Sequence, residues 1–456
     1  MRGFLLFSPQ VRGSSLFSCG ETTTGTGKMG SAHEVNLPEK GRRWTVMSMF
    51  CPFLFPKKLM KFGAYATIMM NYIEQVGANV RLEEGLEARE QLLLACYFQP
   101  GISTKELARK TILPVPVAAA IKKELVRAGA LRQDIGVSCT PEGIAYVEQG
   151  WGYEGLDKEL YLKLLANGDS WRTELADVLL RLSEMFRTRP QANVQIDQAK
   201  CTAETSLKRA VLGLRRHALI GKRTLCVGDD DLVSVSLGLL LRRLYPNAAI
   251  RRTQIDVVDI DDRFLAGIRD IAEREKLPIA CRRCDLREPM PVELRGKYDV
   301  FYTDPPYTLQ GMSLFVSRGL TALKNKKGLP IFLSFAHKSP DFTVALQREL
   351  VRMGLMAGEV IPQFNEYEGA ETIGNRSQMI VLKTTERTTP SITGTFEDPL
   401  YTGEVKRTLR TYRCKRCGVS ISVGQQGDHV TIEELKNRGC RRCGNDTFDV
   451  TDKKNV

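Results

Sequence analysis

The chain has 456 residues, of which 43% are hydrophobic and 26% are charged, and this composition excludes a disordered protein. The length exceeds what one compact domain usually holds and predicts two or three domains. The formal net charge of +13 permits contact with nucleic acid, although scattered surface Lys and Arg side chains would give the same excess.

No segment predicts secretion or membrane insertion. The apolar run Phe4–Phe7 is too short for the core of a signal peptide, and no small-residue cleavage site follows it. No run of about 18 to 20 apolar residues is present, so no membrane partner is expected. Three pairs among the 12 cysteines have CxxC spacing, which fits metal binding in a reducing compartment. We therefore expect a cytoplasmic protein.

Residues 1–70 form an extension without a regular hydrophobic period. Ser, Gly and Thr dominate its first half, and several internal methionines, including Met47 and Met69, are compatible with a start site set too far upstream. Whether this segment belongs to the working protein is left open.

Residues 71–152 predict two helices joined by a short turn and followed by a small β wing, which is the pattern of a winged-helix domain. The expected elements are helices over Glu87–Phe98, from Ile102–Leu107 onward, over Pro114–Ala128 and over Pro141–Gln149, and a hairpin over Ile135–Thr140.

Two roles are open for this domain. Binding to DNA would use basic side chains of the two central helices, whereas packing or dimerisation would use the same fold without nucleic acid. We favour the second role, so a homodimer is compatible with the sequence and a nucleic-acid partner is not required. The basic candidates are Arg109, Lys110, Lys122, Lys123 and Arg127.

Residues 153–385 begin with a helical connector and a helix over Lys200–Leu219, after which strands and helices alternate. Such alternation indicates an α/β fold with a mostly parallel, doubly wound sheet. Seven strands, the last without a helix before it, match the methyltransferase-like variant. The expected strands are Thr224–Val227, Gln254–Asp259, Ile279–Arg283, Val300–Thr303, Pro330–Ser334, Ala357–Ile361 and Gln378–Lys383. The connecting helices are expected at Val233–Tyr245, Asp262–Glu275, Met312–Lys324 and Phe342–Met353.

Residues 386–406 read as a Thr-rich linker, and residues 407–456 carry two cysteine knuckles. In each knuckle a glycine follows a CxxC pair and allows backbone amides to point at sulfur. Together the knuckles supply the four thiolates that tetrahedral zinc requires, so a structural zinc ribbon is expected. The predicted ligands are Cys414, Cys417, Cys440 and Cys443.

The turn Gly228–Asp231 lies between the first predicted strand and its helix, where a doubly wound domain holds a nucleotide. Here three consecutive aspartates, Asp229, Asp230 and Asp231, replace the glycines of a dinucleotide-binding loop. Aspartates suit a helix N-terminus, but three in a row repel one another unless a positive group lies among them.

Acidic residues also follow the next strands. Asp259 is placed to accept both ribose hydroxyls of a nucleoside, with Asp261 as the reserve, and Asp285 is placed to accept from an adenine amino group. One such residue would be explained by helix capping, whereas four at successive strand ends predict a ligand site.

The motif Asp304-Pro305-Pro306-Tyr307 ends the fourth strand. Its prolines fix the loop, so that the Asp304 carboxylate and the Tyr307 ring are held near the reactive end of a cofactor. This suits an amine nucleophile, because the carboxylate accepts its N–H and the ring stacks on it or on a cation. The same motif occurs in amino methyltransferases that act on adenine.

The aspartate turn and the proline motif together favour a donor that is related to the methyl donor S-adenosylmethionine but differs in its charge. A donor with an intact amino-acid carboxylate would be repelled by the aspartate turn, whereas one that keeps only its amine would be attracted. Decarboxylated S-adenosylmethionine, with a sulfonium and an ammonium, has this form. Three glutamates after the sixth strand predict a binding site for a polycation, with a solvated acidic loop as the alternative. They are Glu366, Glu368 and Glu371.

These residues make the chain resemble the branched-chain polyamine synthases, also called N(4)-bis(aminopropyl)spermidine synthases. The resemblance rests on Gly228–Asp231, on Asp304–Thr308 and on the Glu-rich segment before Asn375-Arg376-Ser377, and it covers about residues 71–385. The extension and the cysteine knuckles lie outside the pattern. Organisms that use such polyamines are mostly thermophiles.

The resemblance implies that the secondary amine of spermidine, or of a related polyamine, attacks the propyl carbon of decarboxylated S-adenosylmethionine. Methylthioadenosine leaves, and a second transfer gives a quaternary product. The amine must first lose a proton, so one aspartate acts as general base. We predict Asp231, with Asp230 next and Asp304 as the third catalytic carboxylate, while Gly228, Asp229 and Pro305 contact the donor.

Two alternatives remain from sequence alone. An S-adenosylmethionine-dependent amino-group methyltransferase of DNA or RNA, of the adenine-N6 type, would use the basic charge, the N-terminal domain and the ribbon. A transcription factor without enzymatic activity would leave the strand-end acids without a role.

Overall fold

The computed structural model describes residues 72–79, 85–166, 168–246, 252–370, 373–402, 408–424, 427–429 and 431–455. The predictions for residues 1–70 and for Glu371 lie outside these ranges. Among the helices in these ranges, none combines the length and the apolar character that crossing a bilayer requires.

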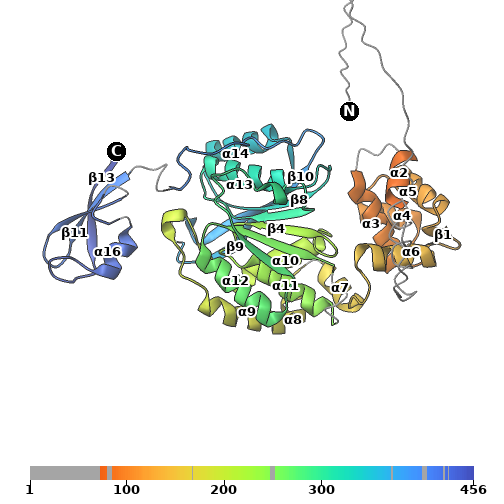
Figure 1. Ribbon diagram of the computed structural model, residues 1–456, viewed down its shortest axis with the longest axis horizontal. Coiled ribbons are helices and arrows are strands. Elements are labelled where there is room, and N and C mark those ends of the chain that lie inside the picture. Colours follow the sequence, from red (N-terminus) through yellow and green to blue (C-terminus); the bar gives the residue numbers. More distant parts are fainter. Residues whose placement is uncertain are drawn as a thin grey trace, which may run out of the picture. The chain divides into compact units, whose positions relative to one another are not determined.

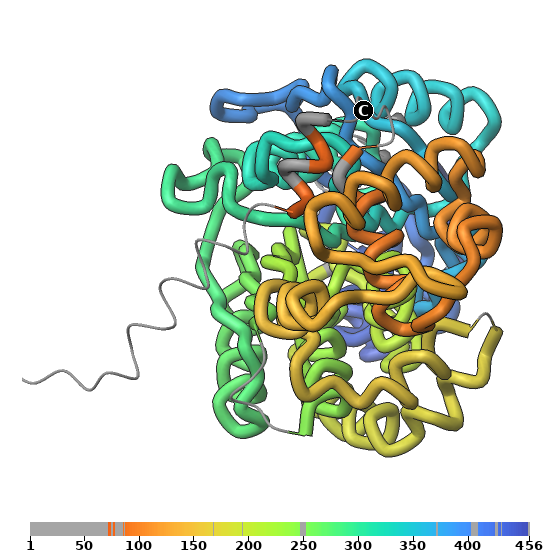
Figure 2. The backbone as a smooth tube through the Cα atoms, turned by 90° about the vertical axis from the view of Figure 1, so that its right-hand side faces the viewer, coloured from red at the N-terminus to blue at the C-terminus, as the bar shows by residue number. Residues whose placement is uncertain are grey.

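Helices and one short hairpin make up residues 72–79 and 85–150, and the orange tube of Figure 2 shows them gathered together. Ser103 caps the helix expected from Ile102–Leu107 onward by accepting from Glu106 N at 3.1 Å. The turn after this helix passes through Ile112, which has a φ of 54°. The elements are α2 (Tyr72–Asn79), α3 (Gly85–Phe98), α4 (Thr104–Thr111), α5 (Val115–Arg127), β1 (Leu131–Gln133), β2 (Val137–Cys139) and α6 (Pro141–Ala145), followed by a π turn over Tyr146–Gly150.

Three helices and a short strand lead into the sheet. The helix predicted from Lys200 begins later, because residues 200 and 201 pair with the sheet and Thr202 then caps the helix by accepting from Thr205 N. The elements are α7 (Lys158–Leu165), α8 (Trp171–Glu174), α9 (Ala176–Thr188), a 3₁₀ turn over Val194–Ile196, β3 (Lys200–Cys201) and α10 (Ala203–Arg215).

The central sheet has the strand order β3-β9-β10-β8-β7-β4-β5-β6. Strands β4 to β8 run parallel, whereas β10 lies antiparallel between β8 and β9. This is a methyltransferase-like α/β fold with a mixed sheet, as the sequence predicted. The strands are β4 (Arg223–Val227), β5 (Gln254–Asp259), β6 (Ile279–Arg283), β7 (Val300–Thr303), β8 (Pro330–Ala336), β9 (Leu355–Glu368) and β10 (Arg376–Thr384).

Helices cover both faces of this sheet. Figure 1 shows α13 and α14 on one face and α10, α11 and α12 on the other. The strands bury both faces, so β4 and β7 read as continuous apolar runs. The helices are α11 (Val233–Leu244), α12 (Asp262–Glu275), α13 (Leu309–Ala322) and α14 (Pro340–Arg352), with a 3₁₀ turn over Val292–Leu294.

The described sheet differs from the prediction in two places. It has eight strands rather than seven, because β3 adds to β9 at the edge. Strand β9 also runs on to Glu368, so Glu366 and Glu368 lie in a strand and not in the loop expected from sequence. The side chains there alternate between buried and exposed, which is the pattern of a strand with one covered face.

Much of the segment predicted as a linker packs on the sheet domain. Leu400 and Phe396 are buried against Leu314 of α13, and Arg318 donates to the carbonyl oxygens of Ile392 and Gly394. Residues 386–402 therefore cover α13 instead of spanning a gap.

Beyond that segment a small three-stranded sheet has the order β12-β11-β13. Its elements are β11 (Thr408–Cys414), β12 (Ser420–Val423), α16 (Ile432–Arg438) and β13 (Phe448–Asn455).

Candidate active site

The turn after β4 begins with a backbone conformation that few residues other than glycine adopt. Gly228 has a φ of +73°, and its N–H donates to Val258 O of the neighbouring strand at 2.9 Å. The chain then passes through Leu232, with a φ of 53°, before α11 begins. This geometry presents three carboxylates in different directions.

Asp229 points at the start of α11. Its carboxylate accepts from Val233 N at 2.7 Å and from Ser234 N at 3.1 Å, so it caps the helix. Burial raises the pKa of Asp229 to about 7, against the hydrogen bonds from these residues. The structure thus places this predicted donor contact in a capping position.

Asp231 points into the protein and pairs with Arg209 of α10. Its Oδ2 lies 2.6 Å from Arg209 Nη1, and its Oδ1 accepts from Cys201 N at 3.1 Å. Burial alone would raise the pKa of Asp231, but the charge of Arg209 and the hydrogen bonds hold it below its ordinary value.

Asp230 is the aspartate of the turn that faces open space. Its Oδ2 accepts from Ala199 N at 3.1 Å, and its side chain lines an open cavity at this edge of the sheet. Burial, and then the neighbouring charges of Asp231, Asp259 and Asp304, raise the pKa of Asp230 well above its usual range.

The acids after β5 and β6 reach the same cavity. Asp259 lines it while accepting from Asp229 N at 2.9 Å and from Asp261 N at 2.8 Å. Asp285 lines it and accepts from Arg287 N at 2.9 Å. The reserve candidate Asp261 instead caps α12 and pairs with Arg263, so the structure brings Asp259 and Asp285 to the cavity.

The loop after β7 holds its carboxylate through two tyrosines. Asp304 Oδ1 accepts from Tyr307 OH at 2.9 Å, and Oδ2 accepts from Tyr367 OH at 2.6 Å and from Arg209 Nη2 at 2.9 Å. Burial raises the pKa of Asp304 to about 6, although Arg209 opposes that rise. Pro306 lines the cavity, whereas Pro305, predicted to contact the donor, is buried and is not among the lining residues.

The open cavity has a volume of about 550 Å³ and lies at the carboxyl ends of the parallel strands, where doubly wound proteins bind ligands. Its wall holds five aspartates and one arginine, together with apolar and backbone groups from the segment that covers α13. The lining residues are Ile196, Asp197, Gln198, Gly228, Asp230, Asp259, Ile260, Asp285, Leu286, Arg287, Asp304, Pro306, Phe315, Leu400 and Tyr401.

The glutamates of β9 lie apart from this lining. Glu366 is exposed and pairs with Arg376 at 3.2 Å, and Glu368 is exposed opposite Lys200 of β3. Between them Tyr367 turns inward to the site. The structure therefore brings the aspartates together but leaves these glutamates on the outer surface of β9.

Sequence reasoning missed the buried network behind the aspartates. Arg209 Nε donates to Asn365 Oδ1 at 2.8 Å, and Asn365 Nδ2 donates to Ser377 Oγ at 2.9 Å. One signal was present, because Arg209 stands on the buried face of α10, where Thr205 and Ala210 are also buried. A charged residue inside an apolar stripe requires a buried partner.

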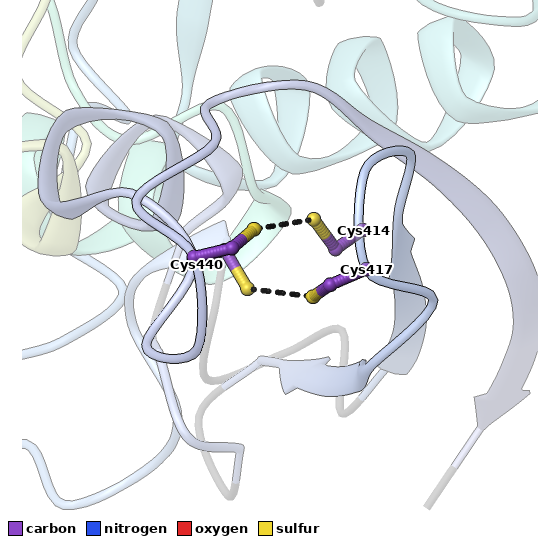
Figure 3. Close-up of side chains that lie close together, drawn as sticks. Cys414, Cys417 and Cys440 are labelled. Carbon is purple, nitrogen blue, oxygen red and sulfur yellow. Dashed lines mark hydrogen bonds between the residues drawn. The ribbon is translucent and has the colours of Figure 1, made fainter.

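The four knuckle cysteines converge at a second location, and Figure 3 shows Cys414, Cys417 and Cys440 there. Their Sγ atoms all lie within 4.8 Å of one another, with 3.6 Å between Cys414 and Cys443 and 3.5 Å between Cys417 and Cys440. Tetrahedral zinc with bonds of about 2.3 Å separates its sulfurs by about 3.8 Å, so this group has the right size and donor set for the metal. Asn445 Nδ2 donates to Cys414 Sγ at 3.4 Å.

Comparisons of the sequence relate the chain to known proteins. Residues 177–421 match the sequence model described as the branched-chain polyamine synthase A C-terminal domain. An uncharacterized protein of Methanocaldococcus jannaschii is 35% identical over 379 residues, which cover 82% of this chain and 91% of that protein.

A second protein of M. jannaschii, named N(4)-bis(aminopropyl)spermidine synthase, is 30% identical over 257 residues, which cover 56% of this chain and 70% of that protein. Among solved structures, a similar one is the branched-chain polyamine synthase of Thermus thermophilus in complex with N4-aminopropylspermidine and 5′-methylthioadenosine. It has a TM-score of 0.43 and 23% identity and covers 75% of this chain and 98% of that one.

Proposed function

The chain belongs to the branched-chain polyamine synthase family, and on this premise we propose that it transfers aminopropyl groups from decarboxylated S-adenosylmethionine to the secondary amine N4 of spermidine. The products are a branched polyamine and methylthioadenosine. The protein is a transferase, and family membership favours this reaction over the adenine-N6 type of methyl transfer. The observation that carries the proposal is the cavity wall, in which five aspartates face one arginine. Such a wall attracts a sulfonium, an ammonium and a polyamine, and it repels a free carboxylate.

The donor would occupy the part of the cavity between β4 and β6. Asp259 is positioned for the ribose hydroxyls and Asp285 for the adenine amino group, while Gly228 lets the backbone approach closely. Both carboxylates already accept from backbone amides, which fixes their orientation before the ligand arrives. A fixed orientation lowers the cost of binding.

The chemical step moves one proton and one aminopropyl group. The spermidine ammonium gives its proton to a carboxylate, and the freed nitrogen attacks the propyl carbon next to sulfur. The new C–N bond forms as the C–S bond breaks, and its electron pair leaves with neutral methylthioadenosine. The remaining carboxylates stabilise the positive charges of the substrate.

Between the two aspartates predicted as base, the contacts favour Asp230 over Asp231. Asp230 faces the cavity, and its raised pKa suits a group that must accept a proton near neutral pH. Asp231 is held by Arg209 with a lowered pKa, which makes it a poor proton acceptor. We therefore assign Asp230 as the base and Asp231 as an anchor, with Asp304 and Tyr307 shaping the amine site.

Glu366 and Glu368 are assigned an outer role. They are exposed on β9, next to the inward-facing Tyr367, and carry negative charge that suits a distal ammonium of a long polyamine. A proposal for Glu371 at the same site rests on sequence alone.

We also propose that the four knuckle cysteines hold one structural zinc ion. The donor set, the distances and the positive φ of Gly418 (+71°) and Gly444 (+69°) support a closed thiolate site. The metal would stabilise a small domain whose described apolar core contains few residues.

Residues 72–150 are interpreted as a winged-helix domain with a packing role. Four of the five basic candidates for DNA contact bond to side chains within the domain: Lys110 to Gln99, Lys122 to Thr104, Arg109 to Glu106 and Arg127 to Glu124. Helix α3 also reaches the sheet domain, where Glu90 pairs with Lys222 at 2.9 Å and Glu87 with Lys383 at 2.6 Å.

Incubation of the purified protein with spermidine and decarboxylated S-adenosylmethionine tests the reaction. We expect methylthioadenosine and branched polyamines, detected by chromatography and mass spectrometry. The absence of methylthioadenosine, together with methylation of DNA or RNA from S-adenosylmethionine, would overturn the proposal.

A further inference from the structure

Arg209 is a buried cation inside a site built to bind cations. It comes from α10, is 2% exposed, and donates to groups on three other parts of the fold. Its guanidinium reaches Asp231 Oδ2 at 2.6 Å, Asp304 Oδ2 at 2.9 Å, Asn365 Oδ1 at 2.8 Å and Tyr367 OH at 3.1 Å. A planar group with five donors can hold several acceptors in fixed positions at once.

These contacts divide the aspartates into two groups. Asp231 and Asp304 share one guanidinium, and Asp304 accepts from two tyrosines besides. Asp230 accepts a hydrogen bond from Ala199 N, and no cation among the described residues pairs with it. The carboxylates that Arg209 holds are thus fixed and compensated, while the remaining one faces the cavity.

We propose that Arg209 is a positioning residue that neutralises Asp231 and Asp304 and thereby leaves Asp230 as the carboxylate that accepts the substrate's proton. This inference rests on the proposed aminopropyl transfer. Arg209 then neutralises Asp231 and Asp304, a role that a substrate ammonium would otherwise have. These charges are therefore already balanced before the substrate binds.

The effect of removing Arg209 follows from charge. With Asp230, Asp231 and Asp304 ionised, the cluster carries three negative charges and one positive charge. Loss of the positive charge raises the pKa of each carboxyl group, because an opposite charge within about 4–6 Å usually lowers such a value by 1–3 units. The base then needs a higher pH to ionise.

Every variant keeps the other titratable side chains around the cluster, although the charge of Arg209 also lowers the pKa of Cys201, Tyr307 and Tyr367 against the effect of their burial. The side chains that every variant keeps are Lys208 on α10, Cys201 on β3, Asp229 in the turn, Asp259 at the end of β5, Tyr307 after β7 and Tyr367 on β9.

The experiment compares Arg209→Met, Arg209→Lys and the wild type by the pH profile of kcat/KM, followed as methylthioadenosine release. We expect the acid limb of Arg209→Met to move up by about 1 pH unit or more. The limb of Arg209→Lys should stay at the wild-type position despite slower turnover, because the charge is kept and the geometry is lost. The substrate amine titrates identically with all three proteins. A difference in the pH of the acid limb therefore comes from a group on the enzyme.

Equal limbs in all three proteins would overturn the inference while leaving the proposed reaction intact. Failure of the wild type to release methylthioadenosine would instead refute the reaction. If Arg209→Met turns over too slowly, its thermal unfolding midpoint at pH 6 and pH 8 gives the same comparison. We expect its deficit relative to wild type to grow with pH, since ionised carboxylates then lack their cation, and a deficit independent of pH would contradict the inference.

Discussion

Replacing Asp230 by Asn should abolish most turnover while leaving the fold at least as stable as the wild type. Asn keeps the size of the side chain and can accept from Ala199 N, but it cannot take a proton from the amine. A positioned general base contributes about 10²- to 10⁴-fold, or about 2.7–5.5 kcal/mol of the barrier. We expect kcat to fall within that range.

The thermal stability of Asp230→Asn should not fall with its turnover. Burial and neighbouring carboxylates raise the pKa of Asp230, so its ionised form costs free energy in the folded state above that pKa. Asn removes this cost, and the unfolding midpoint at pH 8 should be unchanged or higher. Asp231→Asn differs, because it takes one of two carboxylates from the buried Arg209. Breaking a buried pair costs roughly 3 kcal/mol at the low end, which is roughly 6 to 12 °C for a domain of this size.

The assay pairs methylthioadenosine release under saturating substrates with thermal unfolding of the same preparations. Asp262→Asn is the matched control, because Asp262 is exposed on α12 and pairs with Arg283 outside the cavity. It should match the wild type in both measurements. Wild-type turnover by Asp230→Asn, or an Asp231→Asn protein as stable as the wild type, would refute the division of roles between the two aspartates.

Three further predictions concern pH, metal and salt. Burial raises the pKa of Asp229 to about 7 and of Asp304 to about 6, so the folded state binds protons more tightly than the unfolded chain. The free energy of unfolding should therefore fall as the pH rises through 6 to 7. Asp229→Asn should make this fall smaller in thermal unfolding, and an unchanged slope would contradict the prediction. The wild type and the control Cys281→Ser should each bind one equivalent of zinc, measured by mass spectrometry of metals, and Cys440→Ser should lose it. Full retention of zinc by Cys440→Ser would exclude the proposed site. Glu368→Gln should raise the KM for spermidine about 2- to 5-fold at low salt and have no effect at high salt, whereas a salt-independent change would argue against an outer electrostatic role.

The parts of the fold that were predictable are those with strong local signals. Gln254–Asp259 and Val300–Thr303 are buried apolar strands between helices, and the structure gives both with the predicted bounds. The helix expected from Ile102–Leu107 onward was predictable because its start, which Ser103 caps in the structure, is set by short-range contacts. Strand β3 and the end of β9 at Tyr367 and Glu368 were not, since they pair with each other across more than 160 residues of sequence.

The site shows the same division. The aspartates at strand ends were found because the fold places successive strand ends together, and four of the cavity's acids were named in advance. Arg209 was missed because its meaning depends on Asp304 and Tyr367, which lie 95 and 158 residues away. Without that arginine, nothing in the sequence separated Asp230 from Asp231, and Asp231 was predicted as the base.

The acidic cavity has a kinetic consequence, because it lies in a chain whose net charge is +13. At an ionic strength of about 0.01 M, where charges act over about 30 Å, a polyamine meets a repelling protein at long range and an attracting wall only near the entrance. Added salt should therefore speed the encounter by screening the repulsion, and also shorten the residence of the bound polyamine by weakening the attraction. Ionic strength would set the balance between capture and release instead of simply inhibiting the enzyme.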